Sequence, residues 1–178
     1  MFPEKKKLLN IRKNGKAERG TDMLYKEKNY RDGASIVPKK IAGEIKKGLT
    51  DVPNNLKQYQ IKRFNDDFMD YLIQNGWTKK IILTEKSKIS ISAAKQRIGL
   101  CIQTGNMARF YADLIKMQAL FLNSKITSAI YIIPTKECAR EIGSNVANFE
   151  RLVNELENVF SKVITVPMLI IGFYKGEE

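Results

Sequence analysis

The spacing of apolar residues predicts a series of helices along the chain. Phe64, Phe68 and Leu72 recur at four-residue intervals, so they share one face of a helix. A first, shorter helix is expected after Pro38, with Gly48 as its stop signal. The pattern predicts helices within five segments: 36–49, 64–75, 106–123, 136–142 and 147–160.

Strand patterns lie between these predicted helices, in segments 81–83, 89–92, 98–104, 129–133 and 168–174. In the third of them Gly99, Cys101 and Gln103 fall on one face, because successive side chains of a strand alternate. The order of hairpin, helix, strand, helix and strand predicts an α/β fold, with a mixed central sheet flanked by helices.

The first part of the chain lacks a clear period. Residues 4–33 are polar and basic, and glycines interrupt any repeat. We therefore expect residues 1–35 to form a basic arm or a few short elements, and residues 36–178 to form the core domain. A chain of 178 residues is long enough for one well-packed domain.

Basic side chains outnumber acidic ones along the whole chain. Lys and Arg total 31 against 19 Asp and Glu, which gives a net charge of +12 and a pI near 9.7. Residues 1–50 alone carry 14 basic and 6 acidic side chains. Such a surface favours a phosphate backbone as partner, because each neutralised phosphate releases condensed counterions. The alternative is a protein-interaction module whose basic charge has no nucleic-acid partner.

Several function classes are excluded by the residues that the sequence lacks. It contains no histidine, which rules out histidine triads and histidine-ligated zinc, so any metal would need oxygen ligands such as Mg²⁺ prefers. No apolar run is long enough to cross a bilayer, and residues 1–7 are followed by no segment of signal-peptide type. With only two cysteines as well, the expectation is a reduced, cytoplasmic protein.

Two runs of residues carry a more specific pattern: GLCIQTGN at 99–106 and RFYADL at 109–114. The apolar run 130–134, the loop and helix start at 144–150, and the run 169–172 follow in the same order. Upstream, the helix over 64–75 ends in Gly-Trp before the hairpin. In this order and spacing, residues 62–174 resemble the core of the BglII and BstYI type II restriction endonucleases, which have the PD-(D/E)XK nuclease fold.

The resemblance implies a homodimer that binds palindromic double-stranded DNA and cleaves it with Mg²⁺. In that family an Asp begins one strand and a Glu-x-Gln stands on the next, so that two carboxylates hold the ion. Gln103 matches the last position of this motif, whereas Cys101 stands at the Glu and Ser92 at the Asp. A thiol and a hydroxyl are poor ligands for magnesium.

Three explanations of these replacements remain open. The protein is a catalytically inactive DNA-binding regulator or a subunit of a larger nuclease assembly, or it is a disabled form of an active site-specific deoxyribonuclease. In the third, the carboxylates have moved, and Asp113, Glu85 or Asp70 reaches the site. Asp113 is the best of these metal candidates, and its competing role is an ion pair with Arg109 or Lys116 on its own helix.

The resemblance also assigns candidate DNA contacts. Ser144 and Asn145 match the short polar segment that contacts bases, and an asparagine can bond adenine through N6 and N7. The alternative is that this loop only caps the helices on either side. Lys136, Arg140 and the basic arm are candidates for phosphate contacts.

Overall fold

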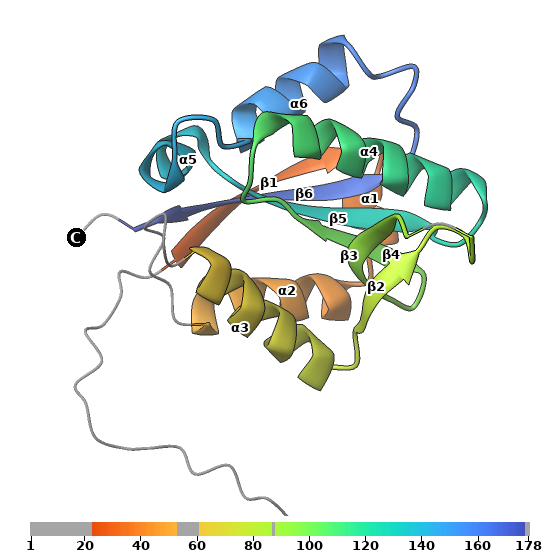
Figure 1. Ribbon diagram of the computed structural model, residues 1–178, viewed down its shortest axis with the longest axis horizontal. Coiled ribbons are helices and arrows are strands. Elements are labelled where there is room, and N and C mark those ends of the chain that lie inside the picture. The colour runs from red at the N-terminus through yellow and green to blue at the C-terminus, as the bar shows by residue number, and fades with distance from the viewer. Residues whose placement is uncertain (1–22, 53–60, 87, 177–178) are drawn as a thin grey trace, which may run out of the picture.

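A six-stranded sheet in the order β1-β6-β5-β4-β3-β2 runs through the centre of the molecule (Figure 1). The computed structural model describes residues 23–52, 61–86 and 88–176, so the part of the expected basic arm before residue 23 lies outside the described residues. The elements follow one another as β1 (Met23–Tyr30), α1 (Gly33–Ile36), α2 (Lys39–Asp51), α3 (Ile61–Gln74), β2 (Thr78–Ile82), β3 (Ser90–Lys95), β4 (Ile98–Ile102), α4 (Met107–Leu122), β5 (Ser128–Pro134), α5 (Lys136–Ile142), α6 (Phe149–Asn158) and β6 (Met168–Lys175).

The sheet is mixed, which confirms the predicted α/β class. β4, β5 and β6 are parallel to one another, while β1 pairs antiparallel with β6. β2, β3 and β4 form an antiparallel meander at the other side of the sheet. The turn between β3 and β4 consists of Gln96 and Arg97, both with positive φ, as a two-residue hairpin of this twist requires.

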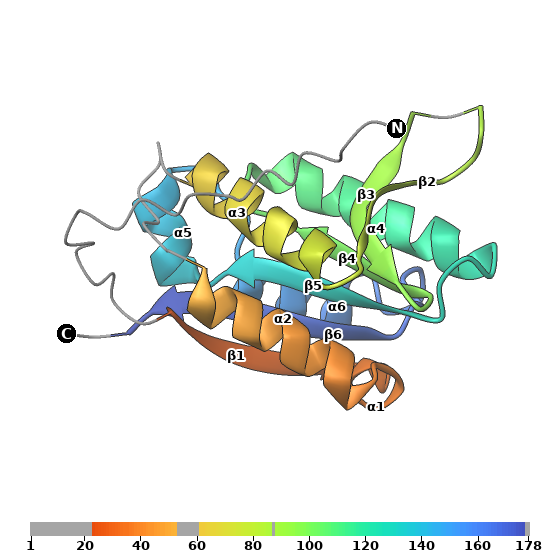
Figure 2. The ribbon, with the colours of Figure 1, turned by 90° about the horizontal axis from the view of Figure 1, so that it is seen from below.

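Helices cover both faces of the sheet (Figures 1 and 2). α2 and α3 lie on one face, where Phe64, Phe68 and Leu72 are fully buried, as their spacing predicted. α4 and α6 lie on the other face, with Phe110 and Leu152 in its core. Every residue of β5 is buried, because helices cover it on both sides. None of the helices within the described residues has the length and apolar character needed to span a membrane.

Gly48 does not end α2, contrary to our expectation, and the helix continues to Asp51. The glycine instead faces α3, where a Cβ atom would lie 2.5 Å from the ring of Tyr71 and 2.8 Å from that of Phe68. The small residue therefore allows the two helices to approach each other. A sequence pattern cannot distinguish this use of glycine from a stop signal, because both place it near a helix end.

β1 lies in the segment that the sequence indicated as an arm or short elements. Its eight residues pair with β6 along the whole length of β1, so the sheet takes in part of residues 1–35. The strand is at the edge of the sheet and half of its residues are exposed. Lys26 and Lys28 form ion pairs with Glu150 and Glu157 of α6, respectively. Because several of its side chains are charged, the segment does not show the alternation of apolar and polar residues that predicts a half-buried strand.

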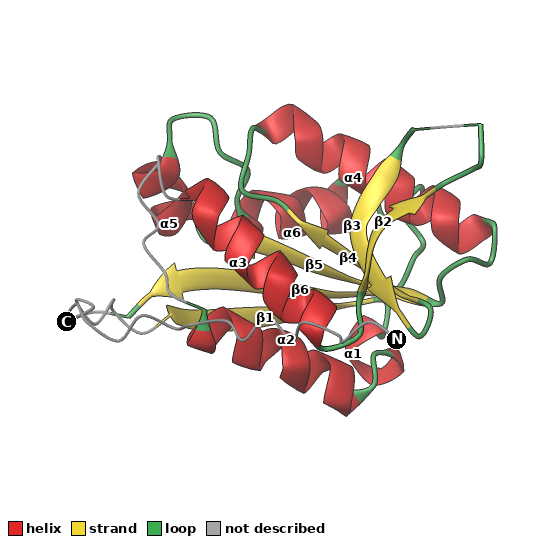
Figure 3. Cartoon of the chain, turned by 60° about the horizontal axis from the view of Figure 1, so that its bottom comes forward, coloured by secondary structure: helices red, strands yellow, loops and turns green. Residues whose placement is uncertain are grey.

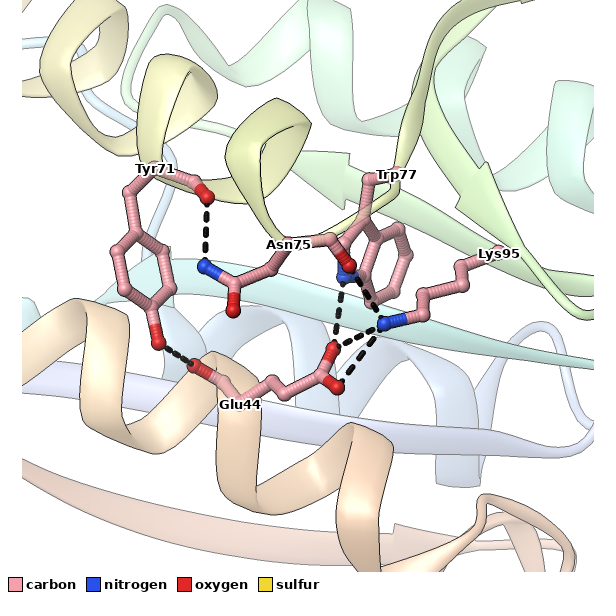
Figure 4. A network of polar contacts seen from close by, with 5 residues as sticks. All are labelled: Glu44, Tyr71, Asn75, Trp77 and Lys95. Atoms are coloured by element: carbon pink, nitrogen blue, oxygen red, sulfur yellow. Dashed lines mark hydrogen bonds and ion pairs between the residues drawn. The ribbon is translucent and has the colours of Figure 1, made fainter.

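A polar network joins α2, the end of α3 and β3 (Figure 4). The ammonium group of Lys95 donates to both carboxylate oxygens of Glu44, at 2.9 and 2.7 Å, and to the carbonyl oxygen of Asn75 at 2.6 Å. The indole of Trp77 donates to the same carboxylate, and the hydroxyl of Tyr71 donates to the Glu44 carbonyl. These contacts fix the hairpin strand β3 against the helical layer behind it.

Candidate functional site

A cleft of about 500 Å³ opens between α3, α4 and the meander of β2, β3 and β4. Figure 3 shows this hairpin edge of the sheet beside α4. Both polar and apolar side chains line the cleft, and they come from four elements and the end of β4. Its polar side chains are those of Asn65, Lys79, Lys80, Ser90, Ser92, Gln103, Arg109, Asp113 and Lys116.

Ser92, Cys101 and Gln103, which the resemblance predicts to stand at the nuclease motif, lie on the neighbouring strands β3 and β4 or directly after β4. The pairing of Ala93 with Leu100 makes Ser92 and Cys101 the next opposite positions of β3 and β4. The hydroxyl of Ser92 accepts a hydrogen bond from the backbone N–H of Ile102 at 3.3 Å. Ser92 and Gln103 line the cleft, whereas Cys101 lies just beneath it with 1% of its surface exposed.

Asp113 connects this motif to α4. Its carboxylate accepts a hydrogen bond from the amide of Gln103 at 2.7 Å and pairs with Lys116 at 2.9 Å. The hydroxyl of Tyr131 lies 3.5 Å from the same carboxylate. The predicted pairing of Asp113 with Lys116 is therefore present, while Arg109 takes no part in it.

The environment of Cys101 does not suit a nucleophile. Burial, and after it the charge of Asp113, raises the pKa of the Cys101 thiol well above its ordinary value. Burial likewise raises the pKa of Cys138, on α5, to about 12. Both thiols therefore stay protonated at neutral pH.

The donor set at the motif does not fit a magnesium ion. Cys101 offers a neutral, buried thiol, and the side-chain oxygen of Gln103 already accepts the N–H of Gly105 at 2.8 Å. Both oxygens of Asp113 are engaged by Gln103 and Lys116. Asp70 and Glu85, the other acids considered, do not line the cleft. In the described part of the chain, no three His, Cys, Asp or Glu side chains gather as a metal site would require.

The loop that carries Ser144 and Asn145 lies beside the start of α4. The backbone N–H of Met107 donates to the carbonyl oxygen of Asn145 at 3.2 Å, and that of Ala147 donates to Gly105 at 2.9 Å. Both side chains of the predicted base-reading pair are exposed. Asn148 rather than Asn145 caps α6, so the capping alternative does not account for Asn145.

Lys136 and Arg140 lie on α5, which follows β5, and both side chains are exposed. They do not line the cleft. Since β4 and β5 are parallel, their carboxyl ends meet at the same edge of the sheet. The motif glutamine and the start of α5 therefore lie at that common edge.

Sequence reasoning missed most of the cationic lining of the cleft. Lys79, Lys80, Arg109 and Lys116 face a single carboxylate there, that of Asp113. The sequence counted these side chains in the net charge, and it placed Lys79 and Lys80 before the predicted strand 81–83, whereas β2 begins at Thr78. Nor did any signal place Asn65 of α3 in the cleft, where its amide donates to Thr104 at 2.7 Å.

Comparisons with known proteins agree with this architecture. The profile of the family described as "Restriction endonuclease BglII/BglIII" matches residues 25–173. Among solved structures, the crystal structure of restriction endonuclease BglII complexed with a DNA 16-mer is similar, with a TM-score of 0.71 at 16% sequence identity. The alignment covers 87% of this chain and 80% of that chain, which establishes a shared fold. A search of curated proteins found no match.

Proposed function

The chain belongs to the BglII/BglIII restriction endonuclease family, and from this premise we propose that it binds double-stranded DNA selectively in the cleft between α3 and α4. Magnesium-dependent phosphodiester cleavage, which the family implies, is not supported by the ligands that this cleft offers. The observation that carries the binding proposal is the charge of the cleft, in which four cationic side chains face one carboxylate. Cations placed in this way neutralise backbone phosphates.

Selectivity in this proposal comes from the loop of Ser144 and Asn145. Both side chains are exposed, and backbone hydrogen bonds hold the loop to the start of α4. A loop held in this way presents its amide and hydroxyl groups in a fixed direction, which base-edge recognition requires. Lys136 and Arg140 supply phosphate contacts next to it.

A palindromic DNA site presents two equivalent half-sites, so we also propose that the protein acts as a homodimer. The described surface supports an apolar contact at α4. Ile115 and Val163 are 65% and 64% exposed, and with Tyr111 and Phe160 they line an apolar hollow of about 310 Å³. Exposed apolar groups that gather in one place are typical of an interaction surface.

A selection from randomised duplex DNA tests the proposed function. We expect the protein to enrich a palindromic sequence and to leave the recovered duplex uncut in Mg²⁺. Replacing Ser144 and Asn145 by alanine should reduce the preference for that sequence, by about 1–3 kcal/mol for each base contact, with little effect on binding to other DNA. Absence of salt-sensitive DNA binding would contradict the proposal, and robust cutting would show that the cleft is catalytic.

A further inference from the structure

Lys80 has an unusual backbone conformation at the cleft. It lies within β2 but has a φ of +55°, in the left-handed region that residues other than glycine rarely adopt. β2 and β3 pair at Lys79 with Ala93 and at Ile81 with Ile91, which leaves Lys80 opposite Ser92 without a ladder pairing. The interruption therefore falls at the position where the family's metal-binding Asp would stand.

This conformation changes where two lysines point. In a regular strand Lys79 and Lys80 would face opposite sides of the sheet. Because Lys80 interrupts the alternation, both line the cleft, and within the described residues neither has an acidic partner. A left-handed conformation is unfavourable for lysine, and strain of this kind is concentrated at functional sites.

Lys116 brings a further ammonium group to the cleft from α4. It pairs with Asp113 at 2.9 Å, and its side chain is 26% exposed, so it is held in place yet remains open to a ligand. Arg109, about two helical turns before it, also lines the cleft. Cationic groups thus reach the motif from the strand side and from the helix side.

The neutral residues Ser92 and Cys101 change the electrostatics of the site. Carboxylates at positions 92 and 101 would add two negative charges and repel a phosphate until a divalent ion was bound. Ser92 and Cys101 carry no such charge, since the Cys101 thiol stays protonated. The cationic side chains therefore outnumber the one carboxylate before any metal is added.

Resting on the proposed function, we propose that Lys80 and Lys116 form a metal-independent subsite for a backbone phosphate of DNA. In this proposal their ammonium groups supply the positive charge that a divalent ion would supply in the family, and the hydroxyl of Ser92 is a further donor in the lining of the same cleft. The subsite holds the DNA backbone against the motif without activating water for its cleavage.

Binding of a mixed-sequence duplex, measured by fluorescence anisotropy in EDTA and in Mg²⁺ at equal ionic strength, tests this proposal. Wild-type protein should bind equally well in both buffers. The variant K80Q/K116Q should bind more weakly, and the slope of log K against log salt should be smaller by about 2, because two phosphate-neutralising charges are lost. The variant K80R/K116R, which keeps both charges, should retain most of the salt dependence.

The matched control is K39Q/K40Q, which removes two exposed lysines from the start of α2, on the layer that covers the β1 side of the sheet (Figure 2). It should keep the wild-type slope. Thermal unfolding of each variant verifies that the fold is intact. Inorganic phosphate at constant ionic strength should leave the duplex bound, because one subsite is only part of the interface.

Three results would overturn the subsite while leaving DNA binding in place. The first is binding of the duplex by the wild type only in Mg²⁺. The second is a salt dependence of binding by K80Q/K116Q that equals that of the control K39Q/K40Q. The third is displacement of the duplex by inorganic phosphate, which would indicate a site for small anions. If the wild-type protein bound no duplex in either buffer, the proposed function itself would fail.

Discussion

At the scale of single residues, Ser92 and Cys101 decide what the cleft can hold. They stand on the adjacent strands β3 and β4, each one position beyond the pairing of Ala93 with Leu100, and Cys101 is buried within the electrostatic influence of the Asp113 carboxylate. A glutamate at position 101 would therefore bring a second negative charge into a site with little water. Such a pair of carboxylates is destabilising unless a cation lies between them.

The double variant S92D/C101E should consequently acquire magnesium-dependent stability. Without a divalent ion, like charges beside Asp113 should lower its thermal unfolding temperature. With Mg²⁺ at about a hundredfold excess over its dissociation constant, binding stabilises the folded state by about 2.7 kcal/mol, which corresponds to a shift of about 5–10 °C. Thermal unfolding in EDTA and in Mg²⁺ measures this shift.

The matched control for that experiment is S92N/C101Q, which has side chains of the same size without charge. Neither this control nor the wild type should respond to Mg²⁺. An unfolding temperature of S92D/C101E that is independent of Mg²⁺ would show that positions 92 and 101 do not face a common ion site. Cleavage of DNA by the double variant would in addition show that Gln103 is aligned for catalysis.

The buried thiols provide a pH-dependent test of the same region. Burial raises the pKa of both cysteines, that of Cys138 to about 12, so the folded protein holds these protons above pH 9.0, where an unfolded thiol releases them. The free energy of unfolding should thus fall as pH rises above 9.0. Thiol titration with a disulfide reagent should find both cysteines protected in the native protein and reactive in denaturant. Rapid reaction of Cys101 in the native protein would contradict its burial.

At the scale of elements, α2 contains two glycines in opposite situations. Gly48 faces the rings of Tyr71 and Phe68, and the Tyr71 hydroxyl is held by the carbonyl of Glu44. Gly43 has no atom within 4 Å of the place where a Cβ would stand. The same substitution in one helix should therefore have opposite effects at the two positions.

The variant G48A should destabilise the protein by about 1–3 kcal/mol, because α2 and α3 must move apart or the rings must shift. G43A should stabilise it by about 0.4–1 kcal/mol, since alanine is the better helix former and restricts the unfolded chain. Urea unfolding of both variants measures the difference. Equal effects would mean that the two helices do not pack as closely as the structure shows.

At the scale of the whole molecule, the hollow between α4 and the segment after α6 bears on oligomeric state. The proposed homodimer covers the exposed apolar side chains there, so charges in the hollow should separate the two copies. I115E/V163E should sediment as a monomer at concentrations at which the wild type is a dimer. L122E changes a leucine that is 70% exposed at the end of α4 but does not line the hollow. This control should remain dimeric, and a dimer of I115E/V163E would place the contact elsewhere.

Much of this architecture could be predicted from the sequence. The apolar periods located α3, α4, α5 and α6 and the strands β3 to β6, because burial of one face demands a regular spacing of apolar residues. For β2 they located only its last two residues. The order of motifs also identified the family. β1 was not predicted, because an edge strand with charged side chains shows little alternation of apolar and polar residues.

The sequence by itself determined the fold class, the basic charge and the absence of carboxylates at positions 92 and 101, because each depends on residue type and local order alone. Only the tertiary structure decided that Lys80 stands opposite Ser92 and that Lys79, Lys80 and Lys116 line the same cleft. It also decided that the carboxylate of Asp113 is already bound by Lys116 and Gln103. These are contacts between elements far apart in the chain, and one left-handed residue is enough to reverse the direction of a side chain that strand periodicity would assign.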